Sequence, residues 1–183
     1  MQQKLRFALI VPALALAAAC ARETATPSEF EYAVPGASGI ADARIASDLA
    51  AVRNLTAPFH DLETAQAAGW SVLVPRCRDN PPTGGMGWHY ANPAFIDGVV
   101  SPLEPEVLVY EPQKNGQQKL VGVEYLIPWS ILPSTAEPPT LFGQQFLPNS
   151  GDEVWMLHVW IWANNPDGMF ATWNPNVSCQ HAG

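Results

Sequence analysis

Basic residues are scarce in this chain of 183 residues, with nine lysines and arginines against 17 aspartates and glutamates. The formal net charge is −8 at neutral pH. A surface of this sign repels nucleic-acid phosphates and anionic lipid headgroups. We therefore predict no nucleic-acid partner, and we expect a small molecule or a metal ion instead.

The motifs of several common enzyme classes are also missing. The chain contains no HExxH sequence, no phosphate-binding glycine loop and no dinucleotide fingerprint. Its serines and threonines lack the context of a nucleophile elbow. These absences disfavour zincin-type proteases, nucleotide-dependent enzymes and serine hydrolases. The sequence also contains no internal repeat, which disfavours a solenoid.

One apolar run is conspicuous, at the N-terminus. Residues 7–19 follow Lys4 and Arg6 and end in small residues. Such a run is typical of a secretory signal peptide and is too short to span a bilayer. We predict a signal peptide over residues 1–19 and a flexible tether over residues 20–38, which are polar with proline and serine.

Cys20 directly follows three alanines, which resembles a lipoprotein box. The pattern departs from that box because Leu16 stands four residues before the cysteine rather than three. We predict lipidation of Cys20, with ordinary signal cleavage as the alternative. The protein would then be a periplasmic or outer-membrane-anchored lipoprotein, held at the membrane only by its lipid, and otherwise secreted.

Cysteine is rare, and Cys77 and Cys179 are the two that remain besides Cys20. Two cysteines in an oxidising compartment most simply pair. Neither lies in a CxxC sequence, which disfavours a zinc site made of cysteines. We predict one disulfide, closing a loop of about 100 residues.

Residues 39–183 have the size of a single domain. Apolar residues recur at helical spacing over residues 38–59, and Asp61 is placed to cap a second, short helix. Strand patterns follow, with a hairpin of residues 106–112 and 119–128 around Asn115-Gly116 and a strong strand over 153–162. This order predicts an α+β domain with N-terminal helices packed on a twisted, mainly antiparallel sheet.

His89, Glu124 and His158 form the candidate site. Each lies inside an apolar, strand-like run, and a buried carboxylate is costly unless it is paired or bound to a cation. Two imidazoles and a carboxylate suit a divalent metal with open positions. The alternative is a buried hydrogen-bonded triad, and the spacing does not decide between the two.

Strand parity makes a further prediction about this site. It puts His158 on one face of its strand together with Trp160 and Trp162. In the strand over residues 119–128, it puts Val121 and Glu124 on different faces. The run GGMG, residues 84–87, is expected to form a tight turn that delivers His89 to the sheet.

Seven tryptophans suggest a second kind of site. Aromatic faces beside polar side chains can stack on a sugar or another amphipathic ligand. The candidates are Trp88, Tyr90, Trp160 and Trp162. Filling of the core by these side chains is the alternative.

Several motifs occur together: GMGxHY, PEVLVYEP, LVGVEY, LFGQQF, LHVWxW and GMFxxWNPxVSC. Over residues 55–179 they resemble a family of secreted bacterial proteins without an assigned activity. The resemblance implies that His89, Glu124 and His158 belong to family motifs, and it implies no catalytic role. The order of HY, VLVYE and KLVGVEY also resembles plant oil-body-associated proteins over about 40 residues.

Together these patterns favour a non-catalytic envelope module that binds a small ligand or a divalent metal. The alternative is a metal-dependent enzyme that uses His89, Glu124 and His158. A metal site requires the three side chains to converge within about 5 Å of one point. Scattered side chains would eliminate it.

Overall fold

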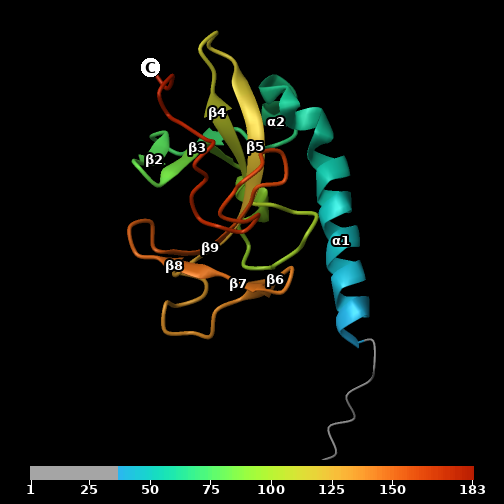
Figure 1. Ribbon diagram of the computed structural model, residues 1–183. Coiled ribbons are helices and arrows are strands. Elements are labelled where there is room, and N and C mark those ends of the chain that lie inside the picture. Colours follow the sequence, from blue (N-terminus) through green and yellow to red (C-terminus); the bar gives the residue numbers. More distant parts are fainter. Residues whose placement is uncertain (1–36) are drawn as a thin grey trace, which may run out of the picture. The chain divides into compact units, whose positions relative to one another are not determined.

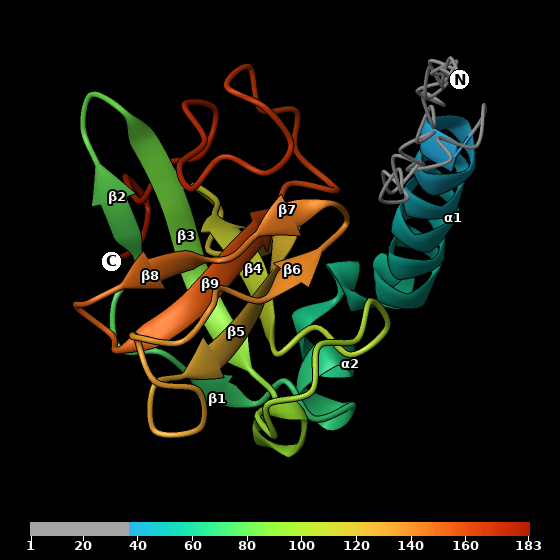
Figure 2. The same cartoon turned by 90° about the horizontal axis from the view of Figure 1, so that it is seen from below.

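The computed structural model describes residues 37–183 and shows helices packed on one face of a mainly antiparallel sheet (Figures 1 and 2). The predicted α+β class is confirmed. The predicted signal peptide, Cys20 and most of the predicted tether lie outside the described residues. The first helix begins at Ala37 and therefore includes the last two residues of the predicted tether, 37 and 38. Within residues 37–183, no helix combines the length and apolarity needed to cross a membrane.

Three helical segments open this part of the chain: α1 (Ala37–Thr56), the 3-10 helix η1 (Ala57–His60) and α2 (Leu62–Ala67). Pro58 lacks the N–H that would continue α1, and the chain changes to η1 just before it. Asp61 caps α2, as predicted, because its carboxylate accepts hydrogen bonds from the Glu63 N–H at 3.2 Å and the Thr64 hydroxyl at 2.7 Å.

The main sheet has seven strands: β1 (Val72–Leu73), β2 (Arg78–Asn80), β3 (Gly84–Ala91), β4 (Val107–Pro112), β5 (Gln118–Pro128), β8 (Leu147–Asn149) and β9 (Val154–Val159). Their order in the sheet is β1-β3-β4-β5-β9-β8, with β2 also paired to β3. All pairings are antiparallel, and the predicted hairpin around Asn115-Gly116 joins β4 to β5. A short 3-10 helix, η2 (Pro93–Phe95), follows β3, and a separate two-stranded sheet is formed by β6 (Thr140–Leu141) and β7 (Gln144–Gln145).

Each face of the sheet carries its own apolar cluster. The helix-side cluster includes the fully buried Val52 of α1, and the Tyr110 hydroxyl donates a hydrogen bond to the Phe59 carbonyl at 2.6 Å. The cluster on the other face is smaller and is covered in part by the chain after β9; its buried members are Ala91, Val107, Val109, Val121, Trp160 and Val177. The helices thus cover one face and leave the other for the candidate site.

The faces predicted for Val121 and Trp162 from strand alternation were wrong, because regular alternation is interrupted in β5 and ends before Trp162 in β9. The register between β4 and β5 shifts after Val109, and this bulge turns Val121 away from the helix-side cluster. Strand β9 ends at Val159, so Trp162 does not continue the alternation. Its indole N–H instead donates to the Thr56 hydroxyl at 3.0 Å, on the helix side.

The run GGMG was predicted to be a tight turn, and that prediction was wrong. Gly84 is the first residue of β3, and the run pairs with β2. The glycines are needed because other backbone segments come very close. A Cβ atom on Gly85 would lie 2.7 Å from the Val177 carbonyl oxygen, and one on Gly87 would collide with the Tyr110 carbonyl.

Replacement of Gly87 by alanine should therefore destabilise the fold strongly. Gly87 has a φ of +93°, and its Cβ would meet backbone that cannot move aside. Gly116 has a φ of +82° with open space around it, so Gly116→Ala is a matched control. We expect Gly116→Ala to cost roughly 1–2 kcal/mol and Gly87→Ala at least ~2 kcal/mol more, measured by urea unfolding. Equal costs would show that close approach is not the reason for glycine at 87.

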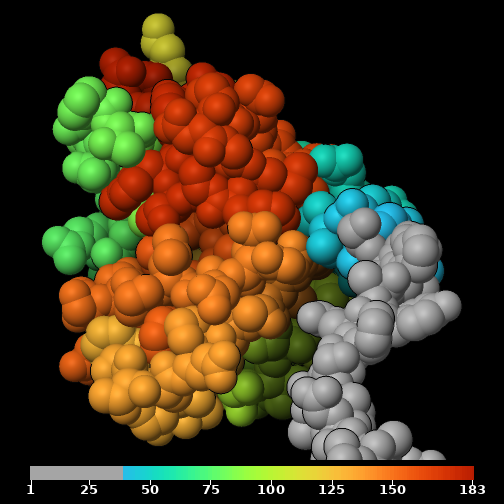
Figure 3. Space-filling view, turned by 60° about the horizontal axis from the view of Figure 1, so that its bottom comes forward, coloured from blue at the N-terminus to red at the C-terminus, as the bar shows by residue number. Residues whose placement is uncertain are grey.

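The predicted disulfide joins Cys77 to Cys179, with a Cα–Cα distance of 5.8 Å. It ties the residue just before β2 to the C-terminal segment. That segment also pairs with β3 through Gly85 and Asn174. Figure 3 shows the C-terminal segment in red beside the green β2 region.

Candidate functional site

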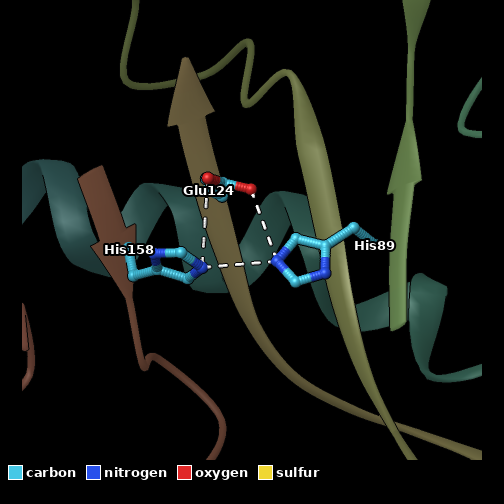
Figure 4. A group of neighbouring side chains, drawn as sticks. All are labelled: His89, Glu124 and His158. Atoms are coloured by element: carbon cyan, nitrogen blue, oxygen red, sulfur yellow. Dashed lines mark hydrogen bonds and ion pairs between the residues drawn. The ribbon is translucent and has the colours of Figure 1, made fainter. Parts of the chain in front are cut away.

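Three neighbouring regions of the sheet supply the candidate site. His89 comes from β3, Glu124 from β5 and His158 from β9. Glu124 and His158 are directly opposite each other in the pairing of β5 with β9. Residues opposite each other on antiparallel strands have close Cβ atoms and point to the same face. His89 reaches them across β4, and all three side chains point toward one another (Figure 4).

The ligand atoms of the three side chains converge, as the metal hypothesis required. The two Nε2 atoms of His89 and His158 are 3.4 Å apart. His89 Nε2 lies 3.5 Å from Glu124 Oε2, and His158 Nε2 lies 4.0 Å from Glu124 Oε1. One ligand atom from each residue lies within 4.8 Å of the other two, and all three residues are buried.

Two of these separations match a tetrahedral ion. Two ligand atoms that are each ~2.1 Å from a metal lie ~3.4 Å apart at the tetrahedral angle and ~3.0 Å apart at a right angle. The 3.4 Å between the two imidazole nitrogens and the 3.5 Å from His89 Nε2 to Glu124 Oε2 match the tetrahedral value. The 4.0 Å contact of His158 Nε2 is made to the other carboxylate oxygen, Oε1, so Glu124 would have to move slightly to complete the set with one oxygen. The donor set of two imidazoles and one carboxylate is one that zinc accepts.

A neighbouring carbonyl orients the His89 ring. Its Nδ1 lies 3.1 Å from the carbonyl oxygen of Gly87, an acceptor, so Nδ1 carries the proton. Nε2 of the neutral ring then presents its lone pair to the cluster. A backbone carbonyl that holds the far ring nitrogen of a histidine is the usual outer-shell support of a metal ligand.

Stacking and burial fix the His158 ring. It stacks on Trp160 with 5.7 Å between ring centroids and an interplanar angle of 15°. The Trp160 indole N–H donates to the Ala171 carbonyl at 2.6 Å, which holds the indole in place. The Nδ1 atom of His158 is buried and has no hydrogen-bond partner within residues 37–183. The ring is therefore positioned by packing rather than by a polar partner.

Burial keeps the metal-free site uncharged near neutral pH. It raises the pKa of Glu124 to about 8 and lowers the pKa of His89 to about 4. Burial, followed by the nearby His89, also holds the pKa of His158 well below its usual value. A divalent ion would require Glu124 to release its proton, and the histidines are already neutral.

A cavity of about 300 Å³ adjoins the cluster and is bordered by His89 and Glu124. Its other polar lining is limited to Arg78, Asn149 and Asp152, and Arg78 pairs with Asp152 at 2.6 Å. The remaining walls are apolar and come from β1, β3, β4, β5, β9 and nearby connections: Val72, Val74, Met86, Ala91, Ile96, Val107, Leu126, Val154 and Met156. His158 borders a smaller cavity of about 120 Å³.

The four aromatic candidates are not brought together. Tyr90 is buried in the helix-side cluster, where its ring meets Tyr110 edge to face. Trp88 packs against the same cluster. Trp160 and Trp162 border one depression of about 290 Å³, but Trp160 is only 3% exposed. None of the four lines the cavity beside Glu124.

Sequence reasoning missed a second buried carboxylate, Glu106. It is 1% exposed, and its Oε2 accepts a hydrogen bond from the Leu126 N–H at 3.2 Å. Burial raises its pKa to about 8. The signal was present, because Glu106 directly precedes the apolar run of β4. Arg78 and Asp152 were also missed, since Arg78 begins the three-residue strand β2 and Asp152 lies in the turn before β9, where no periodic pattern marks them.

Substitution of Glu106 by glutamine should flatten the dependence of stability on alkaline pH. The pKa of Glu106 in the folded protein, about 8, exceeds the ordinary 4.5, so its neutral form favours folding. That contribution is complete below pH 4.5 and is lost as the pH rises through about 8. From about pH 6 to 9 we expect the metal-free wild type to lose on the order of 3 kcal/mol relative to Glu106→Gln, in urea unfolding. Glu124 is common to both proteins, so parallel pH profiles would contradict the expectation.

No protein-family model, no curated protein and no solved structure matches the chain. Its function is therefore inferred from the chemistry of the site.

Proposed function

We propose that this protein binds a divalent metal ion, zinc by preference, through His89, Glu124 and His158. The convergence of two imidazole nitrogens and one carboxylate, with two of the three separations near the tetrahedral value, supports the proposal. Without a cation, burial keeps Glu124 protonated near neutral pH, because an ionised carboxylate in the protein interior is costly. A bound ion supplies the compensating charge.

Three protein ligands leave a fourth tetrahedral position. His89 and Glu124 border the 300 Å³ cavity, so that position would face space large enough for a small molecule. Structural zinc sites use four protein ligands, whereas an open position serves a bound ligand or a reaction. The arrangement therefore supports a binding site rather than a purely structural ion.

The second candidate function is a metal-dependent enzyme acting through a metal-bound water. The open position favours it. Such a reaction also needs a nearby group to accept a proton. Besides Glu124, the cavity is lined by one carboxylate, Asp152, which pairs with Arg78 and accepts a hydrogen bond from Asn149 at 2.8 Å. We therefore favour binding over catalysis.

We also propose that the protein acts in the bacterial cell envelope, anchored through a lipid on Cys20. The signal-like N-terminal run and the lipoprotein-like context of Cys20 support this location. The Cys77–Cys179 disulfide is consistent with an oxidising compartment.

Metal content tests the proposed function directly. The full chain is exported to the periplasm and purified without chelators or a nickel column, and zinc is then measured by mass spectrometry. We expect about one zinc per chain, since a single cluster of three donors is found in residues 37–183. A folded protein that contains no metal, and takes up none from micromolar zinc, would eliminate the proposal.

A further inference from the structure

We propose that a small aliphatic monoanion, with its carboxylate head on the metal and its chain in the cavity, is the ligand of this site. This inference rests on the proposed metal binding and deepens it. It names the class of molecule that takes the fourth coordination position. The class follows from the charge of the site, the chemistry of the cavity walls and the available volume.

Charge balance selects the head group. A divalent ion held by one ionised carboxylate, Glu124, and two neutral histidines has a net charge of +1. Burial makes such a charge costly unless it is compensated. The other charged residues at the cavity, Arg78 and Asp152, already neutralise each other at 2.6 Å. A monoanionic oxygen donor on the metal would bring the centre to neutrality.

The cavity walls select the body of the ligand. Apart from the site and its three polar neighbours, the lining side chains are aliphatic or methionine, and none is aromatic. Aliphatic walls bind a hydrocarbon chain through burial of apolar surface, and they offer neither the hydrogen-bond partners nor the stacking faces that a sugar needs. A volume of about 300 Å³ lies at the lower end for ligand cavities, so the chain is short.

The entrance to the cavity lies at an edge of the sheet. Val72 lines the cavity and is 48% exposed, so it stands where the cavity meets solvent. It belongs to β1, the edge strand beside β3. Val72 pairs with Ala91 of β3 and is not one of the three proposed ligand residues, so a charged residue at this position would face the ligand chain.

The test is calorimetric titration of zinc-loaded protein with butanoate and octanoate. Each fully buried methylene strengthens binding by roughly a factor of four, so the four additional methylenes of octanoate should make it bind up to ~250-fold, and at least ~30-fold if they are only partly buried, more tightly than butanoate. Metal-free protein should bind octanoate at least ~10-fold more weakly than zinc-loaded protein, because the head group loses its partner.

Two matched variants locate the ligand. Val72→Glu should weaken octanoate binding by about tenfold, because it places a negative charge and a polar surface at the entrance. Val99 is 58% exposed and does not line the cavity, so Val99→Glu should leave octanoate binding unchanged. Both variants are titrated after zinc loading has been verified.

The outcomes separate the two proposals. Chain-length-dependent, zinc-dependent binding that only Val72→Glu weakens would support the inference. Zinc-loaded protein that binds neither carboxylate, or binds both equally, would overturn the aliphatic monoanion and leave the metal proposal standing. Protein that takes up no zinc would overturn both.

Discussion

Replacement of His158 by alanine should lower the affinity for zinc by about 100- to 1000-fold. Zinc sites with four protein ligands bind with about 10–16 kcal/mol, so each ligand accounts for roughly 2.5–4 kcal/mol. His158 is one of three converging donors, and its Nε2 lies 3.4 Å from that of His89. Competition with a chromophoric zinc chelator gives the two dissociation constants.

The same loss should appear in thermal stability. Zinc at about 1,000 times its dissociation constant stabilises the folded protein by about 4 kcal/mol, which for a domain of this size raises Tm by roughly 10 °C. We expect this rise in the wild type and only about 1–4 °C in His158→Ala at the same zinc concentration, which is then about 1 to 10 times the weakened dissociation constant. Calorimetry or thermal-shift measurements on metal-free and zinc-loaded samples provide the comparison.

His60→Ala is the matched control for this experiment. His60 is exposed and lies edge-on to Trp162, away from the cluster. It should keep both the zinc affinity and the zinc-dependent rise in Tm. If His60→Ala and His158→Ala lost zinc equally, or if neither lost it, the ion would be bound elsewhere.

Removal of the disulfide should cost about 4 kcal/mol of unfolding free energy. Cys77 and Cys179 are 102 residues apart, and closing a loop of this length restricts the unfolded chain considerably. We expect the double variant Cys77→Ala, Cys179→Ala to unfold at a clearly lower urea concentration, with Tm lower by roughly 10 °C. The bridge also holds the chain just before Arg78, which lies at the cavity.

The protein with the disulfide and the double variant should both carry Cys20→Ala, so that they differ only at Cys77 and Cys179. This substitution removes the third thiol of the chain and leaves the bridge intact. Reduction of the protein with the disulfide should lower its stability to that of the double variant. An unchanged unfolding free energy would mean that the C-terminal segment is held by packing alone, through contacts such as the Gly85–Asn174 pairing.

Local sequence patterns correctly predicted several features of the secondary structure. Asp61 caps α2 with its own side chain, and Asn115-Gly116 supplies a turn between two alternating runs, so these features depend only on nearby residues. The run GGMG, residues 84–87, could not be predicted in this way. Gly85 and Gly87 are required by the backbones of Val177 and Tyr110, which are distant in sequence, and no local pattern reveals that approach.

The sequence by itself determined the class of fold, the pairing of the two available cysteines and the types of residue that could hold a metal. Only the tertiary structure decided that His89 and His158, 69 residues apart, meet at Glu124, because the register of β5 with β9 and the path of β3 place them there. It also decided that the tryptophans are divided between two faces and that the cavity has aliphatic walls. Periodicity along a chain assigns a side chain to a face, whereas convergence depends on register, bulges and packing between distant segments.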